Sequence, residues 1–113
     1  MHEMALTQSV LDILQDAARS RGFTRVTTVR LEIGALSGVE AEAMSFCFNV
    51  IAKNTLAEGA VLEIIRTPGT GKCAQCARPV QIATRFDPCP YCGGYSIQVT
   101  GGGAMLVKNI EVS

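Results

Sequence analysis

Four cysteines of the chain form two pairs, and each pair has two residues between its members. The pairs are Cys73 with Cys76 and Cys89 with Cys92, and twelve residues separate them. A two-residue gap lets both sulfurs of a pair reach one ion from a tight turn, and four thiolates complete a tetrahedral zinc site. Because cysteine fills all four positions, no coordination position is open for a substrate. The pattern therefore predicts one structural zinc ion.

The residues around the second pair support a metal-binding turn. Pro90 lies inside the pair and Gly93 follows it. Proline pre-sets the turn, and glycine adopts the positive φ that such a turn needs. Residues 72–97 contain three of the four prolines and lack the apolar period of a core. Metal binding must then supply much of the folding free energy of this segment, on the order of 10 kcal/mol.

Three other uses of the cysteines are open. Two disulfides are disfavoured because no basic segment followed by an apolar stretch opens the chain, so we expect no secretory signal and a cytoplasmic setting. A redox-active pair is disfavoured because two such pairs occur together at ribbon spacing. A rubredoxin-like iron electron carrier uses the same four thiolates, and spacing alone does not separate iron from zinc. The fifth cysteine, Cys47, lies on an apolar helical stripe, so we expect it to be buried in the core.

The N-terminus holds a second set of potential metal ligands. The Met1 amine, the His2 backbone nitrogen and the His2 imidazole can close chelate rings on one ion, and Glu3 can add its backbone nitrogen or its carboxylate. A planar nitrogen-rich set suits Ni(II) or Cu(II). A bulky residue at position 2 favours retention of Met1. The competing interpretation is a frayed, solvated chain end, which is common for terminal residues. The residues alone leave both interpretations open.

Two helices and three strands are expected outside the cysteine segment. Residues 4–20 and 37–54 show helical periods, the second with Ser37 and Glu40 at capping-box spacing. Residues 25–33, 60–66 and 105–112 predict strands, with Gly101–Gly103 as a flexible joint. The expected core-facing residues are these: Leu6, Val10, Ile13, Leu14 and Ala17; Thr27, Val29, Leu31 and Ile33; Val39, Ala43, Phe46, Cys47, Val50 and Ile51; Leu106, Lys108, Ile110 and Val112.

The predicted fold class is α/β (α+β), a small three-stranded sheet with two helices plus an inserted zinc-ribbon module. We expect the α/β domain to comprise residues 1–67 and 104–113, and the zinc-binding module residues 68–103. The whole chain has 113 residues, of which 48% are apolar and 18% charged, which is enough for a core and excludes a disordered chain.

Composition also excludes several function classes. The formal net charge is zero and no apolar run approaches about 18 residues, so neither a nucleic-acid partner nor a membrane span is expected. A zinc-ribbon adaptor for nucleic acids would need more basic residues than Lys72, Arg78 and Arg85, which Asp87 partly offsets. No nucleophile and base are paired in the sequence, so we do not expect an enzyme.

The motifs taken together resemble one known family. Met1-His2-Glu3 opens the chain, a strand ends in Ile33-Gly34, and Phe46-Cys47-Phe48 lies in the second helix. The two cysteine pairs follow, and then a closing stretch from Leu106 to Val112. In this order and length they are similar to the hydrogenase nickel-incorporation family HypA/HybF. Each motif alone is generic, whereas the combination covers essentially the whole chain.

The resemblance implies a nickel metallochaperone that delivers Ni(II) to the large subunit of [NiFe] hydrogenase, and in some organisms to urease proteins. It implies a HypB-type GTPase as a partner and a chain that is a monomer or weak dimer. It places nickel on Met1, His2 and Glu3, and zinc on Cys73, Cys76, Cys89 and Cys92. Some family members add an acidic ligand where this chain has Glu40, although the residues themselves favour a capping role for Glu40.

Overall fold

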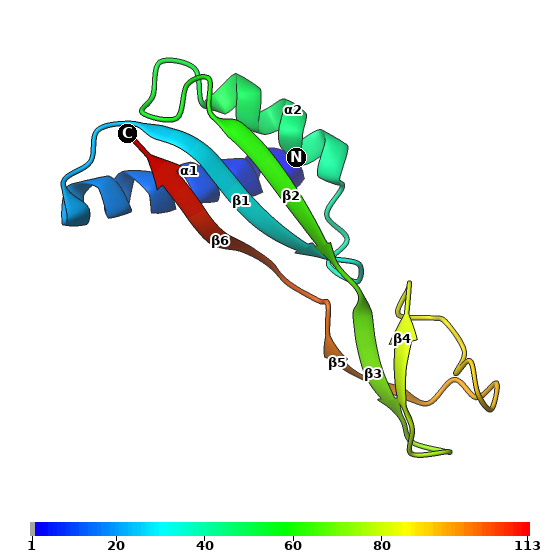
Figure 1. The fold of residues 1–113 in the computed structure, drawn as a ribbon. Helices are drawn as coiled ribbons and strands as arrows, with labels where there is room; N and C mark the ends of the chain where they lie inside the picture. Colours follow the sequence, from blue (N-terminus) through cyan, green and yellow to red (C-terminus); the bar gives the residue numbers. More distant parts are fainter. Residues whose placement is uncertain (1) are drawn as a thin grey trace.

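The structure is a computed structural model that describes residues 2–113, without the side chain of His2, and Met1 lies outside the described residues. Its elements follow the chain as α1 (His2–Arg21), β1 (Val26–Gly34), α2 (Ala41–Ile51), β2 (Val61–Thr67), β3 (Gly69–Cys73), β4 (Pro79–Ile82), β5 (Ile97–Gly101) and β6 (Met105–Val112) (Figure 1). The strands form two separate three-stranded sheets, β2-β1-β6 and β4-β3-β5. We name the part built from α1, α2 and the first sheet the α/β lobe, and the part built on the second sheet the cysteine lobe.

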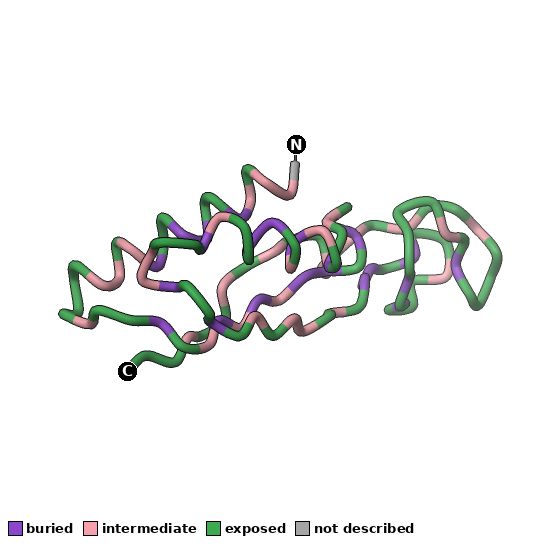
Figure 2. The backbone as a smooth tube through the Cα atoms, turned by 90° about the horizontal axis from the view of Figure 1, so that it is seen from above, coloured by how far each residue is buried: buried purple, intermediate pink, exposed green. Residues whose placement is uncertain are grey.

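The α/β lobe has two layers. β1 is the central strand, parallel to β2 and antiparallel to β6. Parallel neighbours need a long crossover, which α2 provides here. Both helices cover the same face of the sheet (Figure 2). The predicted alternation of β1 is confirmed at Val29, Leu31 and Ile33, which are buried, but it is wrong at Thr27, which is exposed. The core of this lobe consists of Val10, Leu11, Leu14, Val26, Val29, Leu31, Ile33, Ala41, Met44, Phe48, Ala52, Ala57 and Ala60.

The predicted start of the second helix is wrong. α2 begins at Ala41, Glu40 is its N-cap, and the cap has no side-chain hydrogen bond. Ser37 instead closes a local turn, because its Oγ donates to the Gly34 carbonyl at 2.7 Å and accepts from the Val39 N–H at 3.2 Å. Gly38 has a φ of +74°, which interrupts any helix started at Ser37. The expected Ser37–Glu40 capping box therefore does not form.

The predicted core faces of both helices are partly wrong. In α2, Met44 and Phe48 are buried, whereas Phe46 is 68% exposed and Val50 is 44% exposed. Cys47 is buried, as predicted. In α1, Ile13 is 52% exposed and Leu11 is buried. Both helices carry more apolar residues than one core-facing stripe needs, so the period alone does not select the buried row.

A β-bulge explains a further error in β6. The sequence placed Leu106, Lys108, Ile110 and Val112 on one face, yet Leu106 is exposed and Ile110 packs against the core. Arg30 of β1 pairs with Asn109, but the next residue of β1 pairs with Val107, so Lys108 is the extra residue. An extra residue reverses the alternation of the strand beyond it.

Glycines lie where the chain crosses between the two lobes, and backbone hydrogen bonds join the crossing segments there. The chain leaves the α/β lobe after β2 and returns to it as β6. The Leu36 N–H donates to the Gly102 carbonyl at 2.8 Å, and the Gly34 N–H donates to the Ala104 carbonyl at 2.9 Å. A Cβ on Gly34 would lie 2.1 Å from the Gly102 oxygen. The expected flexible joint at Gly101–Gly103 is thus a close-packed, hydrogen-bonded crossing.

The two lobes lie end to end. The Cα radius of gyration is 17.2 Å, whereas a compact chain of this length has about 13 Å. The principal extents of 52 × 27 × 17 Å match the elongated outline in Figure 2. Neither α1 nor α2, the helices described for residues 2–113, is long and apolar enough to cross a membrane.

Candidate metal centre

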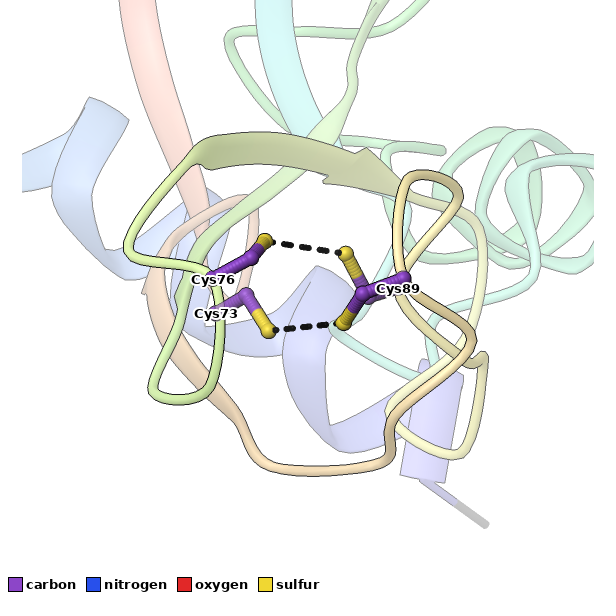
Figure 3. Close-up of side chains that lie close together, drawn as sticks. Cys73, Cys76 and Cys89 are labelled. Carbon is purple, nitrogen blue, oxygen red and sulfur yellow. Dashed lines mark hydrogen bonds between the residues drawn. The ribbon is translucent and has the colours of Figure 1, made fainter.

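The four paired cysteines converge on one point of the cysteine lobe (Figure 3). All four sulfur atoms lie within 4.8 Å of one another. The Cys73 and Cys92 sulfurs are 3.6 Å apart, and the Cys76 and Cys89 sulfurs are 3.7 Å apart. A tetrahedral zinc ion with Zn–S bonds of about 2.3 Å places its sulfurs about 3.8 Å apart. The donor set and its spacing therefore fit zinc, and the separations are far longer than a disulfide bond of about 2.05 Å.

The two cysteine turns are built alike. In the first, the Ala77 N–H donates to the Cys73 carbonyl at 2.8 Å. In the second, the Gly93 N–H donates to the Cys89 carbonyl at 2.9 Å. The residue that follows each pair has a positive φ, 62° at Ala77 and 75° at Gly93. The sequence predicted this conformation at Gly93 and missed it at Ala77, because alanine rarely adopts it.

Secondary structure and burial hold the sulfurs in place. β3 ends at Cys73, and the lobe has a small core of Leu36, Cys73, Val80, Ile82 and Cys89. Leu36 reaches this core from the connection that follows β1. Cys73 and Cys89 are buried, while Cys92 is exposed. Two of the proposed ligands are thus also core residues, so metal binding there would be coupled to packing.

Backbone donors already favour the thiolate form of two ligands. Burial raises the pKa of Cys89, but the backbone N–H groups of Cys92 and Tyr91 outweigh it and lower that pKa to about 6. The Cys76 backbone N–H is the largest cause of the lowered pKa of Cys73. The Gly94 N–H lowers the pKa of Cys92, but its neighbouring thiols and burial raise it to about 11. A metal cation bound by the four sulfurs would displace all of their protons.

Side chains also connect the two turns. The Arg78 guanidinium carbon, just after the first turn, lies 5.0 Å from the centroid of the Tyr91 ring inside the second turn. This is a cation–π contact between the two halves of the site. Gln75 of the first turn lies beside Cys92 of the second, with its Oε1 3.8 Å from the sulfur. Sequence analysis identified neither contact, since both depend on how the turns face each other.

The proposed nickel ligands lie mostly outside the described residues. Met1 is not described, and His2 is described only as the first residue of α1. Glu3 is placed: its Oε2 accepts a hydrogen bond of 3.4 Å from the backbone N–H of Glu40. The start of α1 and the N-cap of α2 therefore lie side by side. Glu40, the possible acidic ligand, is therefore both the N-cap residue of α2 and a spatial neighbour of Glu3.

Comparisons with known proteins identify the family of the chain. A sequence model of the family described as "Hydrogenase/urease nickel incorporation, metallochaperone, hypA" matches residues 1–112. The hydrogenase maturation factor HypA of Albidiferax ferrireducens is 55% identical, and HypA 2 of Bradyrhizobium diazoefficiens is 53% identical. Each alignment covers 99% of both chains. The solution structure of the Ni metallochaperone HypA from Helicobacter pylori shares the fold, with a TM-score of 0.70 at 19% identity over 97% of this chain and 96% of that one. The chain therefore belongs to the HypA family of nickel-incorporation metallochaperones that act in hydrogenase maturation.

Proposed function

We propose that this chain binds Ni(II) through Met1, His2 and Glu3 and delivers it for the maturation of [NiFe] hydrogenase. The observation that carries the proposal is the family match over residues 1–112, which includes all three proposed nickel ligands. The four cysteines hold zinc in this proposal, and zinc keeps the cysteine lobe folded. The activity is binding and transfer rather than catalysis.

The local structure supports nickel at this end of α1. His2 is the first residue of α1, and the first backbone N–H of an α-helix has no acceptor within that helix. A metal that replaces the His2 amide proton then breaks no helical hydrogen bond. The positive end of a helix dipole repels a cation. The carboxylate of Glu3 offsets that repulsion, and Glu40 stands beside it as a candidate additional ligand.

Nickel transfer requires the N-terminus to lie at the contact with its partner. We therefore expect a HypB-type GTPase to bind the α/β lobe near the start of α1. The large subunit of the hydrogenase, or urease proteins, would receive the metal in the cytoplasm. Crosslinks to the GTPase that fall only on the cysteine lobe would contradict this placement.

Calorimetric nickel titration of the untagged, zinc-loaded chain tests the site. His2→Ala removes the imidazole and should abolish specific nickel binding, while zinc content and thermal stability stay unchanged. One extra residue before Met1 should have the same effect with every side chain preserved, because it displaces the free amine. Equal nickel affinity in all three proteins would rule out the N-terminal site.

Lower pH should weaken nickel binding. A free imidazole has a pKa of about 6.5 and an α-amine one of about 7.7–8.0, and both must lose a proton to ligate. Nickel affinity should therefore fall as the pH falls to about 6 and below. Metal analysis of the same samples decides between zinc and iron in the cysteine cluster. About one zinc per chain is expected, whereas a coloured protein with bound iron would support an electron carrier.

A further inference from the structure

The four cysteines of the cluster differ in how far solvent reaches them. Cys92 is exposed and Cys76 is half-buried, whereas Cys73 and Cys89 are buried. Gln75 lies beside Cys92, with its Oε1 3.8 Å from the sulfur, and this contact is exposed to solvent. Cys92 is therefore the member of the cluster that a small molecule in solution reaches first.

The contacts between sulfurs run from one cysteine turn to the other. The Cys92 sulfur lies 3.6 Å from that of Cys73, and the Cys76 sulfur lies 3.7 Å from that of Cys89 (Figure 3). Each of these pairs has one member in the first turn and one in the second. Because a disulfide has an S–S distance of about 2.05 Å, the sulfurs of such a pair need to approach by only about 1.6 Å to form one.

We propose that Cys92 is a site of oxidation by hydroperoxides, and that Cys73 then closes a disulfide with it. The inference rests on the zinc site proposed above, in which all four sulfurs are thiolates. The thiolate is the nucleophilic form of cysteine, so the zinc-loaded chain presents a nucleophilic sulfur at its surface. Cys47, outside the cluster, is buried and should not react.

Two steps lead from the thiolates to the disulfide. The Cys92 sulfur attacks one oxygen of hydrogen peroxide, so that an S–O bond forms, the O–O bond breaks and hydroxide leaves. The Cys73 thiolate then attacks the Cys92 sulfur, so that the S–S bond forms, the S–O bond breaks and a second hydroxide leaves. The two sulfurs together lose two electrons, and the peroxide gains them.

The disulfide removes two of the four zinc ligands. Structural zinc is held by four ligands, so the chain releases its zinc. The two turns nevertheless stay joined, because Cys73 and Cys92 belong to different turns. A second equivalent of peroxide can join Cys76 to Cys89 in the same way. A thiol reductant reverses both disulfides and makes the site available to zinc again.

Treatment of the zinc-loaded full chain with one equivalent of hydrogen peroxide tests the proposal. A chromogenic chelator follows the release of zinc. Peptide mass spectrometry, after free thiols are blocked under denaturing conditions, locates the disulfide. We expect loss of most of the zinc and a linked peptide pair, lighter by two hydrogen atoms, that joins Cys73 to Cys92. Cys47 should be recovered as a free thiol.

Substitution by histidine separates zinc binding from oxidation. Cys92→His keeps four ligands, since three cysteines and one histidine are a common structural zinc set, and it removes the exposed sulfur. It should release zinc at least about tenfold more slowly in peroxide. Cys76→His is the matched control, because it keeps both Cys73 and Cys92 and should release zinc like the wild type.

A second pair of variants leaves every ligand in place. Gln75→Ala uncovers the Cys92 sulfur and should increase the rate of zinc release in peroxide. Gln98→Ala changes an exposed glutamine of β5 in the same lobe and should react at the wild-type rate. If Cys92→His binds no zinc, the disulfide map of the wild type and the rate of Gln75→Ala decide the proposal.

Metal analysis before peroxide is added separates this inference from the zinc site itself. Protein that never contains zinc would contradict the zinc site. Zinc-loaded protein that keeps its zinc and its free thiols in peroxide would overturn only the oxidation site. A disulfide within one turn, a first modification at Cys76 or Cys89, or zinc-loaded Cys92→His that loses zinc as fast as the wild type would also overturn it.

Discussion

The two lobes differ in the size and composition of their buried cores. The core of the α/β lobe contains thirteen buried residues, all apolar and drawn from both helices, β1 and the connection before β2. The core of the cysteine lobe contains five, of which two are cysteines of the metal cluster and a third, Leu36, comes from the connection that follows β1. Among residues 2–113, Val80 and Ile82 are the buried apolar residues of its own sheet, and Ile97 and Val99 pack against them partly buried. Burial can therefore stabilise the first lobe, whereas the second has little apolar core of its own and a metal bound by its cysteines would supply the missing stability.

Loss of one cysteine of the cluster should have the largest effect. Cys89→Ser removes both a ligand and a core residue, and structural zinc contributes on the order of 10 kcal/mol in small domains. We expect metal content to fall to near zero and the amide NMR signals of residues 69–101 to collapse, while signals of the α/β lobe persist. Cys47→Ala, which changes a buried cysteine outside the cluster, should keep its full metal content. A Cys89→Ser protein with an unchanged spectrum would show that metal is not structural.

The second largest effect should come from the α/β core. Phe48→Ala empties a fully buried site, and such truncations cost about 3–5 kcal/mol. The thermal midpoint of the α/β lobe should drop, while zinc content stays the same. Phe46→Ala removes the same side chain from the outward side of α2 and should change stability by less than about 0.5 kcal/mol. Similar losses in both variants would contradict the orientation of this helix.

Gly102→Ala should disturb the crossing between the lobes. Gly102 has a φ of +81°, and a Cβ there would lie 2.3 Å from the Pro68 oxygen. Backbone strain and steric overlap together should cost about 3 kcal/mol, measured by urea unfolding. Gly38→Ala is the control, because Gly38 has a similar φ of +74° but no atom within 4 Å of the added Cβ. Gly38→Ala should lower the free energy of unfolding by only about 1 kcal/mol. Equal losses in the two variants would show that steric overlap at Gly102 adds nothing to the backbone strain.

The smallest effect should be a gain. Ala77 has a φ of 62° at the position that glycine occupies in the second turn. Ala77→Gly should relieve that strain and stabilise the cysteine lobe by up to about 1 kcal/mol. The release of zinc to a chelator should then slow by up to about fivefold, and the reciprocal Gly93→Ala should accelerate it. Unchanged release in both variants would mean that the turns tolerate either residue.

Local patterns predicted the elements well. The strand at Val26–Gly34, the cysteine cluster and the buried Cys47 followed from alternation, spacing and helical period. These features depend on residues close together in sequence, where period and turn chemistry are decisive. The two helices and the outer strands of the first sheet were also placed within a few residues of their bounds.

Tertiary arrangement set the features that the sequence did not predict. α2 offers two apolar rows, and only its packing on the sheet decides that Phe48 is buried and Phe46 is not. The bulge at Lys108 reverses the faces of β6 without any local signal such as glycine. The crossing at Gly34 and Gly102 joins segments far apart in the chain. The contact of Glu3 with the Glu40 N–H arises in the same way.

The insertion of the cysteine lobe between β2 and β6 affects the stability of the α/β sheet. For the α/β sheet, residues 68–104 are a loop that must close before β6 can pair with β1. A folded cysteine lobe keeps the ends of this loop together. Closing a flexible loop of that length would instead cost about 3 kcal/mol of free energy, because the chain loses conformational entropy. A metal ion bound by the four cysteines would therefore contribute to the stability of a sheet that it does not touch. Among the interactions that this indirect contribution would stabilise is the ion pair from Arg30 to Glu111 on the returning strand.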